Sequence, residues 1–230
     1  MTQGTWRIGH RGACGHAPEN TLLSIRKALE LGVHGIEFDI QLSKDGVPVV
    51  IHDDTLERTT SGKGLVSDYT ATELQTFDAG KGELIPTLQQ VLDLVDKRCR
   101  LLIELKAPNS VKPVVRVIEQ AIAQLGWTYE QLYICSFDHR QIAEVKTLNM
   151  DIRTCALLVG IPLALAELAS DAAAWALNPN VHHIDQALVD DAHKRGLKVI
   201  VWTANTPGDI QTMQALGVDG IISDYPDRIA

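Results

Sequence analysis

Short apolar runs alternate with amphipathic helical patterns along the whole chain. The apolar runs have the length of buried strands and cover residues 6–9, 35–40, 101–105, 132–136, 152–158, 198–202 and 220–223. The segments between them favour helices at residues 21–31, 88–95, 111–125, 139–148, 185–195 and 206–216. Several of these close on a glycine that can form a C-cap, namely Gly32, Gly126, Gly196 and Gly217. This alternation predicts an α/β fold, a (β/α)8 TIM barrel.

Two weaker runs leave the strand assignment open, because nine candidate strands compete for eight places. Residues 176–178 form one weak run, and residues 47–51 form another after a predicted turn at 44–46. Either the first of these is not a barrel strand, or the second pairs back as a hairpin arm over the mouth. Asp53 and Asp54, just after the second run, are expected to be turn residues.

Two longer segments complete the predicted architecture. Residues 162–177 are the most apolar helical stretch, and we expect a core-facing helix there, since a membrane span needs ~20 residues. Residues 54–83 are polar and longer than the usual loop of about 2 to 6 residues, so we expect a small inserted cap near the barrel mouth. No internal repeat or linker interrupts the pattern, which predicts one domain over residues 1–230.

Composition narrows the class of protein. The chain has a formal net charge of -8 and no cluster of Lys or Arg, which argues against nucleic acid or an anionic membrane surface as the main partner. Four scattered cysteines suggest neither a disulfide framework nor a zinc site, and the N-terminal residues show no signal-peptide pattern. We expect a cytoplasmic protein without stable membrane insertion, either a monomer or a homodimer.

Charged and imidazole side chains stand where several apolar runs end. On a strand, residues two apart point to the same face, so Glu37 should converge with Asp39, and Glu104 with Lys106. This pattern predicts an active-site rim. Its members are His10, Arg11, Glu37, Asp39, His52, Glu104 and Lys106.

Three of these residues are candidate metal ligands. Glu37, Asp39 and Glu104 offer hard oxygen atoms with no nearby cysteine, which favours one divalent cation, Mg²⁺ or Ca²⁺, over zinc or copper. The alternative is a structural set of ion pairs with Arg11 and Lys106. A structural set would not need two histidines at the same rim, whereas imidazoles suit acid/base catalysis near neutral pH. Beside a metal, the two cations would suit a phosphoryl oxygen.

Other residues near the rim carry weaker signals. Trp202 closes a strand, where it is either core packing or an apolar wall for a small polyol, and Phe137 has the same ambiguity. Cys14 lies close to His10 in sequence and is a candidate nucleophile. We do not expect it to act as one, because nothing near it in the sequence besides His10 and His16 would lower the pKa of its thiol, and the acid/base and metal residues leave no task for it.

The ordered set of motifs resembles the glycerophosphodiester phosphodiesterase family. The resemblance covers nearly the whole chain, in the family's order, without a departure at a position that the family's chemistry depends on. The motifs are His10-Arg11-Gly12, Pro18-Glu19-Asn20-Thr21, Glu37-x-Asp39, Lys44-Asp45-Gly46, His52-Asp53, Glu104-x-Lys106, Ser136-Phe137 and Trp202-Thr203-x-Asn205.

This resemblance implies a barrel of the phosphoinositide-phospholipase-C-like type with divalent metal dependence. It would hydrolyse glycerophosphodiesters such as glycerophosphocholine and glycerophosphoethanolamine to sn-glycerol 3-phosphate and an alcohol. The segment after His52 matches the family's small insertion. The implied roles are acid/base catalysis for His10 and His52, metal ligation for Glu37, Asp39 and Glu104, phosphate contacts for Arg11 and Lys106, and a wall of the glycerol pocket for Trp202.

Three other functions stay open on the sequence. A lysophospholipase D-type phosphodiesterase would need an apolar groove at the mouth, and the polar cap favours a small water-soluble substrate instead. A non-catalytic phosphate- or polyol-binding barrel is disfavoured by the presence of both histidines. A metal-dependent barrel enzyme of another kind would want a lysine base on the opposite rim, whereas Lys106 is the only strand-end lysine identified.

Overall fold

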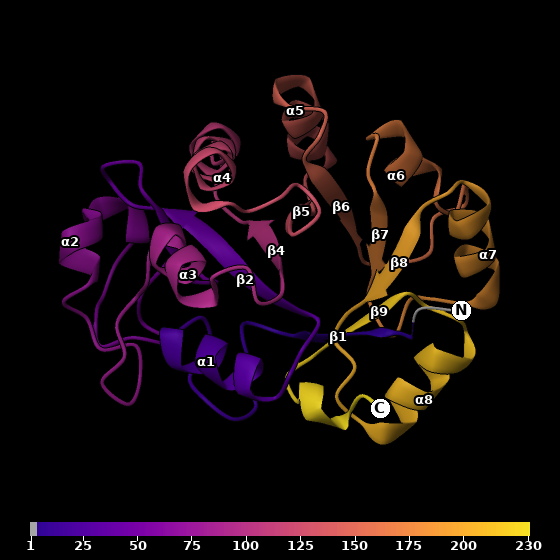
Figure 1. Ribbon diagram of the computed structural model, residues 1–230, viewed down its shortest axis with the longest axis horizontal. Helices are drawn as coiled ribbons and strands as arrows, with labels where there is room; N and C mark the ends of the chain where they lie inside the picture. Colours follow the sequence, from indigo (N-terminus) through magenta and orange to yellow (C-terminus); the bar gives the residue numbers. More distant parts are fainter. Residues whose placement is uncertain (1–3) are drawn as a thin grey trace.

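A computed structural model describes residues 4–230, which form a closed barrel of parallel strands surrounded by helices (Figure 1). Neighbouring strands follow one another around the barrel, and β1 closes it by pairing with both β2 and β9. The predicted TIM barrel is therefore confirmed. The barrel strands are β1 (Trp6–Gly9), β2 (Gly35–Leu42), β4 (Arg100–Leu105), β5 (Leu132–Ser136), β6 (Arg153–Leu158), β7 (Ala176–Pro179), β8 (Lys198–Val201) and β9 (Gly220–Ser223).

Helices connect the strands on the outside of the barrel. The helices predicted at residues 88–95, 111–125 and 139–148 have the expected bounds, and three other predicted helices agree to within one residue at each end. No helix in the described part of the chain is long and apolar enough to cross a membrane. The helices are α1 (Leu22–Glu30), α2 (Ala71–Leu74), α3 (Leu88–Val95), α4 (Val111–Leu125), α5 (His139–Leu148), α6 (Glu167–Asp171), α7 (Gln186–Lys194) and α8 (Pro207–Ala215), with short 3₁₀ helices η1 (Val66–Asp68) and η2 (Pro226–Arg228).

The hairpin strand β3 (Pro48–Val50) settles the choice between the two weak runs. It pairs antiparallel with β2, with Ile40 opposite Val50, and so lies outside the parallel barrel. The other weak run, which became β7, is a barrel strand between β6 and β8. Residues 47–51 are therefore a hairpin arm, as one of the two alternatives stated.

The predicted helix at residues 162–177 is wrong. Only Glu167–Asp171 is helical, Leu163 is fully exposed, and the end of the segment already belongs to β7. Leu165 and Ala173 have φ values of 50° and 52°, in the left-handed region that interrupts a helix on either side of α6. An apolar run that joins a short helix to a buried strand has no clear period, which explains the error.

Alternation along β2 separates the apolar core from the polar interior. Ile36, Phe38 and Ile40 are fully buried in the cluster that packs the sheet against α1 and α3. Because successive strand residues point to opposite faces, Glu37 and Asp39 face the inside of the barrel. Below them, the interior is filled by an apolar cluster that contains Ile8, Leu102, Tyr133, Cys155, Ile200 and Ile222.

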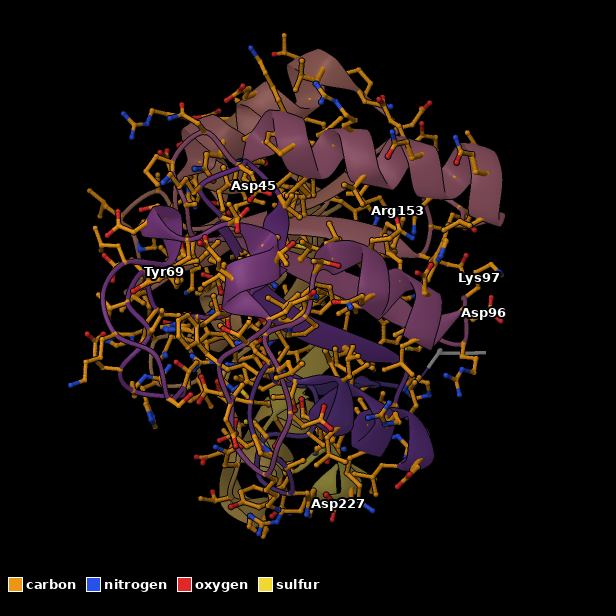
Figure 2. The ribbon with its side chains drawn as sticks, turned by 90° about the vertical axis from the view of Figure 1, so that its left-hand side faces the viewer. Asp45, Tyr69, Asp96, Lys97, Arg153 and Asp227 are labelled. Carbon is orange, nitrogen blue, oxygen red and sulfur yellow. The ribbon has the colours of Figure 1, made fainter. Side chains whose placement is uncertain are left out.

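The polar segment 54–83 forms a cap beside β2 and α3, on the left of Figure 1. It has an apolar cluster of its own, in which Leu56, Val66 and Leu74 pack on Val49 of the hairpin. Asp45, at the hairpin turn, accepts a hydrogen bond of 2.9 Å from the backbone N–H of Ala71 at the start of α2. Figure 2 shows Asp45 and Tyr69 at the cap end of the molecule, opposite Asp96 and Lys97.

Candidate active site

The rim residues expected from the sequence meet at the carboxyl ends of the barrel strands. His10 follows β1, Glu37 and Asp39 lie on β2, and Glu104 lies near the end of β4. His10, Glu37 and Glu104 line one small cavity of about 20 Å³. The other lining residues are Cys135, Leu157, Asn178, Trp202 and Ile222.

A tight turn after β1 brings the backbone to the carboxylates. Arg11 has a φ of 49°, a left-handed conformation that is uncommon for a residue with a side chain. Its N–H donates a hydrogen bond of 3.0 Å to Oε2 of Glu37. At Gly12, φ is 87° and a Cβ would lie 2.3 Å from Oγ of Ser24, so only glycine fits here. The His-Arg-Gly sequence therefore places a side-chain cation and a backbone donor at the site.

Three buried carboxylates lie together inside the rim. One oxygen from each of Glu37, Asp39 and Glu104 lies within 4.8 Å of the others. Burial raises the pKa of Glu104 to about 7, and the charge of Asp39 adds to this effect. Burial, followed by the charges of Asp39 and Glu104, also raises the pKa of Glu37 well above its ordinary value. Such crowding of like charges is costly unless a cation is bound among them.

The side chains present fit a divalent cation. All the clustered donors are carboxylate oxygens, which Mg²⁺ and Ca²⁺ prefer. Oε1 of Glu37 is buried and has no hydrogen-bond partner within residues 4–230, so it is available as a ligand atom. Asn20, one of the residues whose role the sequence did not reveal, donates a hydrogen bond of 2.9 Å to Oδ2 of Asp39 and so orients it.

The ion pairs proposed as an alternative to metal binding are also present. Nε of Arg11 lies 3.3 Å from Oδ2 of Asp39, and Nζ of Lys106 lies 3.5 Å from Oδ1 of the same residue. Lys106 also donates a short hydrogen bond to Glu104. Although burial lowers the pKa of Lys106, the charges of Glu104 and Asp39 raise it by more, and the lysine stays a cation. Two cations thus face three carboxylates, so ionisation of all three would leave the cluster with an excess of negative charge.

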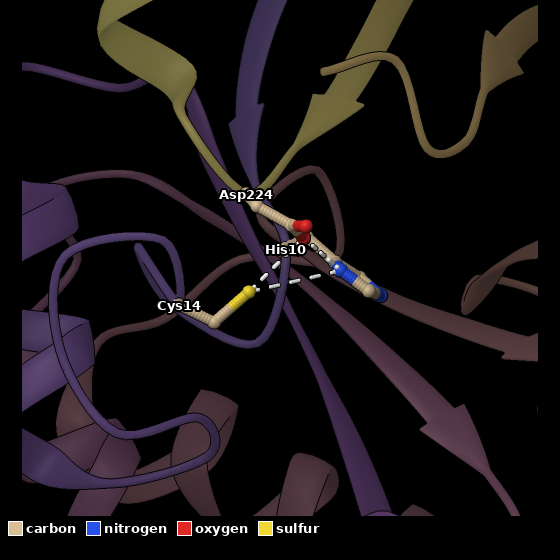
Figure 3. Close-up of side chains that lie close together, drawn as sticks. All are labelled: His10, Cys14 and Asp224. Carbon is tan, nitrogen blue, oxygen red and sulfur yellow. Dashed lines mark hydrogen bonds and ion pairs between the residues drawn. The ribbon is translucent and has the colours of Figure 1, made fainter.

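His10 has a carboxylate partner that the sequence analysis missed. Its Nδ1 lies 2.6 Å from Oδ1 of Asp224, just after β9, as Figure 3 shows. Asn205 donates a hydrogen bond of 2.7 Å to the other oxygen of Asp224. Burial alone would raise the pKa of Asp224, but the bonds from His10 and Cys14 lower it to about 2. An ionised Asp224 fixes the ring of His10, so that Nε2 is directed to the carboxylates, 3.9 Å from Glu37.

His52 has a similar arrangement at the end of the hairpin. Its Nδ1 lies 2.6 Å from Oδ1 of Asp53, which therefore does more than form a turn. Arg58, in the cap, donates a hydrogen bond of 2.6 Å to the other oxygen of Asp53 and holds the pKa of that carboxyl well below its usual range. Arg58 also pairs with Glu19, which in turn pairs with Arg11 at 2.7 Å. This chain of ion pairs connects His52 with the first turn of the site.

Two aromatic rings border the site on the side of β5 and β8. Trp202 and Phe137 form a T-shaped pair with ring centroids 5.5 Å apart. Nε1 of Trp202 donates a hydrogen bond of 2.8 Å to the backbone oxygen of Asn178, which fixes the indole at the cavity wall. Lys106 lies above the ring of Phe137, with Nζ 5.6 Å from its centroid. The apolar wall suggested by Trp202 is therefore in a position to contact a ligand.

The environment of Cys14 does not favour a nucleophile. Its Sγ donates a hydrogen bond of 3.0 Å to Oδ1 of Asp224, as drawn in Figure 3. Burial is the main factor that raises the pKa of the Cys14 thiol far above its ordinary value, and the hydrogen bond to Asp224 adds to it. A thiol that stays protonated is a poor nucleophile, so this geometry supports the sequence-based expectation.

Residues 10–228 match the model of the glycerophosphoryl diester phosphodiesterase family. A glycerophosphodiester phosphodiesterase of Caldanaerobacter subterraneus subsp. tengcongensis is 37% identical over 231 residues, which cover 96% of this chain and 95% of that protein. The matched range begins at His10 and extends past Asp224.

Solved structures with the same fold are also similar in sequence. An Oleispira antarctica phosphodiesterase in complex with the product sn-glycerol-3-phosphate is 32% identical, with a TM-score of 0.89 over 96% of this chain and 94% of that one. A glycerophosphodiester phosphodiesterase from Agrobacterium tumefaciens is 28% identical, with a TM-score of 0.82 over 98% of each chain.

Proposed function

The chain belongs to the glycerophosphodiester phosphodiesterase family and is therefore a phosphoric diester hydrolase, and from this premise we propose how its own residues catalyse the reaction. The substrates proposed are glycerophosphocholine, glycerophosphoethanolamine and related diesters, cleaved to sn-glycerol 3-phosphate and an alcohol. The observation that carries the proposal is the meeting of three buried carboxylates with two carboxylate-paired histidines at one barrel mouth. Barrel and cap act as one catalytic unit, since Arg58 of the cap holds the partner of His52.

Glu37, Asp39 and Glu104 would hold one divalent cation, Mg²⁺ or Ca²⁺. A cation bound there supplies positive charge to a phosphoryl oxygen and lowers the pKa of the attacking hydroxyl. Arg11 and Lys106 bind the same phosphoryl group and offset the charge that develops on it in the transition state. Their existing pairs with Asp39 hold both cations near the place where the phosphate binds.

The two histidines divide the proton transfers between them. His10 acts as general base at Nε2, since its Nδ1 is occupied by Asp224. His52 acts as general acid and gives a proton to the leaving alcohol from Nε2, because its Nδ1 is bound to Asp53. Each carboxylate stabilises the imidazolium form of its histidine, which helps the base to accept a proton and the acid to be regenerated.

The attacking group is proposed to be the 2-hydroxyl of the substrate's own glycerol. Its attack on phosphorus breaks the bond to the alcohol and forms a cyclic phosphate, which water then opens while the histidines exchange roles. Direct attack by water is the competing route. A glycerophosphocholine analogue without the 2-hydroxyl separates the two, because the cyclic route cannot begin on it whereas the direct route can.

A second candidate substrate is a lysophospholipid, and one observation favours it. Exposed apolar side chains follow β5 and β6 at the mouth, with exposed fractions of 45% for Phe137, 57% for Val159 and 45% for Ile161, and Leu163 is fully exposed. Phe137 packs on Trp202 at the cavity wall. An acyl chain on the glycerol could lie along this rim. Glycerophosphodiesters remain the first proposal, because the cavity itself is small and bordered by charges.

The test is release of glycerol 3-phosphate from glycerophosphocholine by the purified protein. The assay is run before and after treatment with EDTA, and with Mg²⁺ and Ca²⁺ added back separately. Release that depends on a metal supports the proposal, and the metal that restores it identifies the cofactor. If a folded protein releases no product with either metal, release of choline from lysophosphatidylcholine tests the second candidate, and binding without turnover would indicate a non-catalytic barrel.

A further inference from the structure

Asn178 on β7 is a fully buried amide without a hydrogen-bond partner for its side chain. Its exposed fraction is 0%, and neither Oδ1 nor Nδ2 finds a partner among residues 4–230. Burial of an unpaired amide costs stability, because both groups lose the hydrogen bonds that they make with water. Such a group is uncommon in a folded protein and suggests a role that involves a ligand.

The side chain of Asn178 points into the mouth cavity. Its neighbour Leu177 belongs to the outer apolar cluster, so Asn178, which alternates with it, faces the barrel interior. Asn178 lines the same cavity as His10, Glu37 and Glu104. In the strand order, β7 lies across the barrel from β2, which carries Glu37 (Figure 1). The amide thus borders the cavity on the side opposite the carboxylates.

The rest of the cavity on this side is apolar. Leu157 and Ile222 line it, together with Trp202, whose indole N–H is held by the backbone oxygen of Asn178. The cavity of about 20 Å³ has room for a group the size of one water molecule. The cavity is therefore a small subsite with apolar walls and one amide that can both donate and accept a hydrogen bond.

We propose that Asn178 is a specificity-determining residue that binds the terminal hydroxyl of the substrate's glycerol moiety. A hydroxyl can donate to Oδ1 and accept from Nδ2, which would satisfy both orphaned groups. The 2-hydroxyl lies nearer to phosphorus and stays on the side of His10. The terminal hydroxyl is one carbon farther from phosphorus and reaches across to Asn178. This inference rests on the proposed function, because it assumes that a glycerol moiety binds at the mouth.

The experiment compares glycerophosphocholine with an analogue that lacks only the terminal hydroxyl, in the presence of the activating metal. The wild-type protein should prefer glycerophosphocholine by at least about tenfold in kcat/KM, since an unpaired amide rejects the deoxy compound. Asn178→Leu should lose this preference while its melting temperature stays equal or rises, because leucine branches at the same carbon as asparagine and removes the buried amide. A variant that melts no lower but keeps the wild-type preference overturns the proposal.

Thr154→Val serves as the matched control. Oγ1 of Thr154 is also buried without a partner in the described chain, but its neighbour Cys155 faces the interior, so Thr154 faces the helices. This variant removes an orphaned polar atom away from the cavity and should keep the full substrate preference. A preference lost in both variants would mean that general changes in packing cause the effect, and the proposal would then be wrong.

A binding assay separates failure of this inference from failure of the proposed function. The thermal shift produced by sn-glycerol 3-phosphate is compared with that of its analogue without the terminal hydroxyl. A larger shift for glycerol 3-phosphate in the wild type, lost in Asn178→Leu, supports the subsite even if neither diester is hydrolysed. Equal shifts for the two compounds in the wild type overturn it, whether or not the protein is active.

Discussion

Nδ1 of His10 and Oδ1 of Asp224 lie 2.6 Å apart although 214 residues separate them in the chain. The contact exists because β1 pairs with β9 along the seam that closes the barrel, with Gly9 opposite Ser223. Each residue is thus the first to follow its strand at the carboxyl end. The geometry at this seam places an ionised carboxylate behind the proposed general base.

Asp224→Asn should reduce kcat by about 10- to 100-fold with little change in KM. The amide keeps the size of the side chain but cannot stabilise the imidazolium that His10 forms when it takes a proton. Steady-state kinetics on glycerophosphocholine measure the effect. Cys14→Ser is the control, since it alters another donor to Asp224 and leaves the His10 pair in place, and it should keep most of the activity. Equal losses in both variants would contradict the special role of the His10 pair.

His10→Ala and His52→Ala should each lose about 10² to 10⁴ in rate while staying folded, since each removes one acid/base partner. Circular dichroism and thermal melting check the fold, and product release checks the rate. His182→Ala is a suitable control, because this histidine is exposed in the segment after β7. A His10 or His52 variant that retains more than about a tenth of the wild-type rate would show that its assigned role is wrong.

Glu37→Gln should weaken the affinity for the activating metal by at least about tenfold, with activity partly restored by excess metal. Burial and, after it, the charges of Asp39 and Glu104 raise the pKa of Glu37. In EDTA, the melting temperature of the variant should not fall, because the neutral amide removes both a buried charge and this crowding. Calorimetric titration measures the affinity. Glu57→Gln, an exposed change in the cap, should leave the metal requirement unaltered. A lower melting temperature with an unchanged metal requirement would favour a purely structural set of ion pairs.

Asp219→Asn should lower the free energy of unfolding by about 1 kcal/mol near neutral pH. Asp219 accepts hydrogen bonds from Lys198, from the backbone N–H of Val199 and from His193, and although burial raises its pKa, these bonds lower it by more. A carboxyl with a lowered folded-state pKa stabilises the fold fully above its unfolded-state pKa of about 3.9. That contribution is lost as the pH falls through the folded-state pKa.

Urea unfolding of the wild type and Asp219→Asn at a series of pH values measures this effect. The difference between them should be constant down to about pH 5 and should shrink below about pH 4. Asp171→Asn, which removes an exposed carboxylate at the end of α6, should show a much smaller difference throughout. A difference that grows on acidification would contradict a lowered pKa for Asp219 in the folded state.

The period of the apolar pattern was sufficient to predict the barrel and most of its helices. It was insufficient where a run had no clear period, as in the segment around α6, and where pairing decides between alternatives, as for β3 and β7. Strand pairing depends on contacts between residues far apart in the chain, which a local pattern does not contain.

The candidate site was predictable as far as the strand-end rule applies. His10, Glu37 and Glu104 were found by that rule, and the structure places all three around one cavity. Asp224 also follows a strand, so the same rule could have found it, but its partner is determined by closure of the barrel. Asn178 ends an apolar run next to a proline and carried no signal, because an orphaned amide is recognisable only once its neighbours are known.

The hairpin strand β3 forms a wall between two apolar interiors, since Val50 packs in the barrel core and its neighbour Val49 packs in the cap. The barrel can therefore stay intact while the cap changes in length or sequence, as happens when related enzymes diverge or when loops are grafted in design. A replacement of the cap must preserve the role of Arg58, because this cap residue binds Asp53, the partner of His52. A new cap that supplies a cation at the position of Arg58 would change the shape of the mouth and keep the acid/base pair functional.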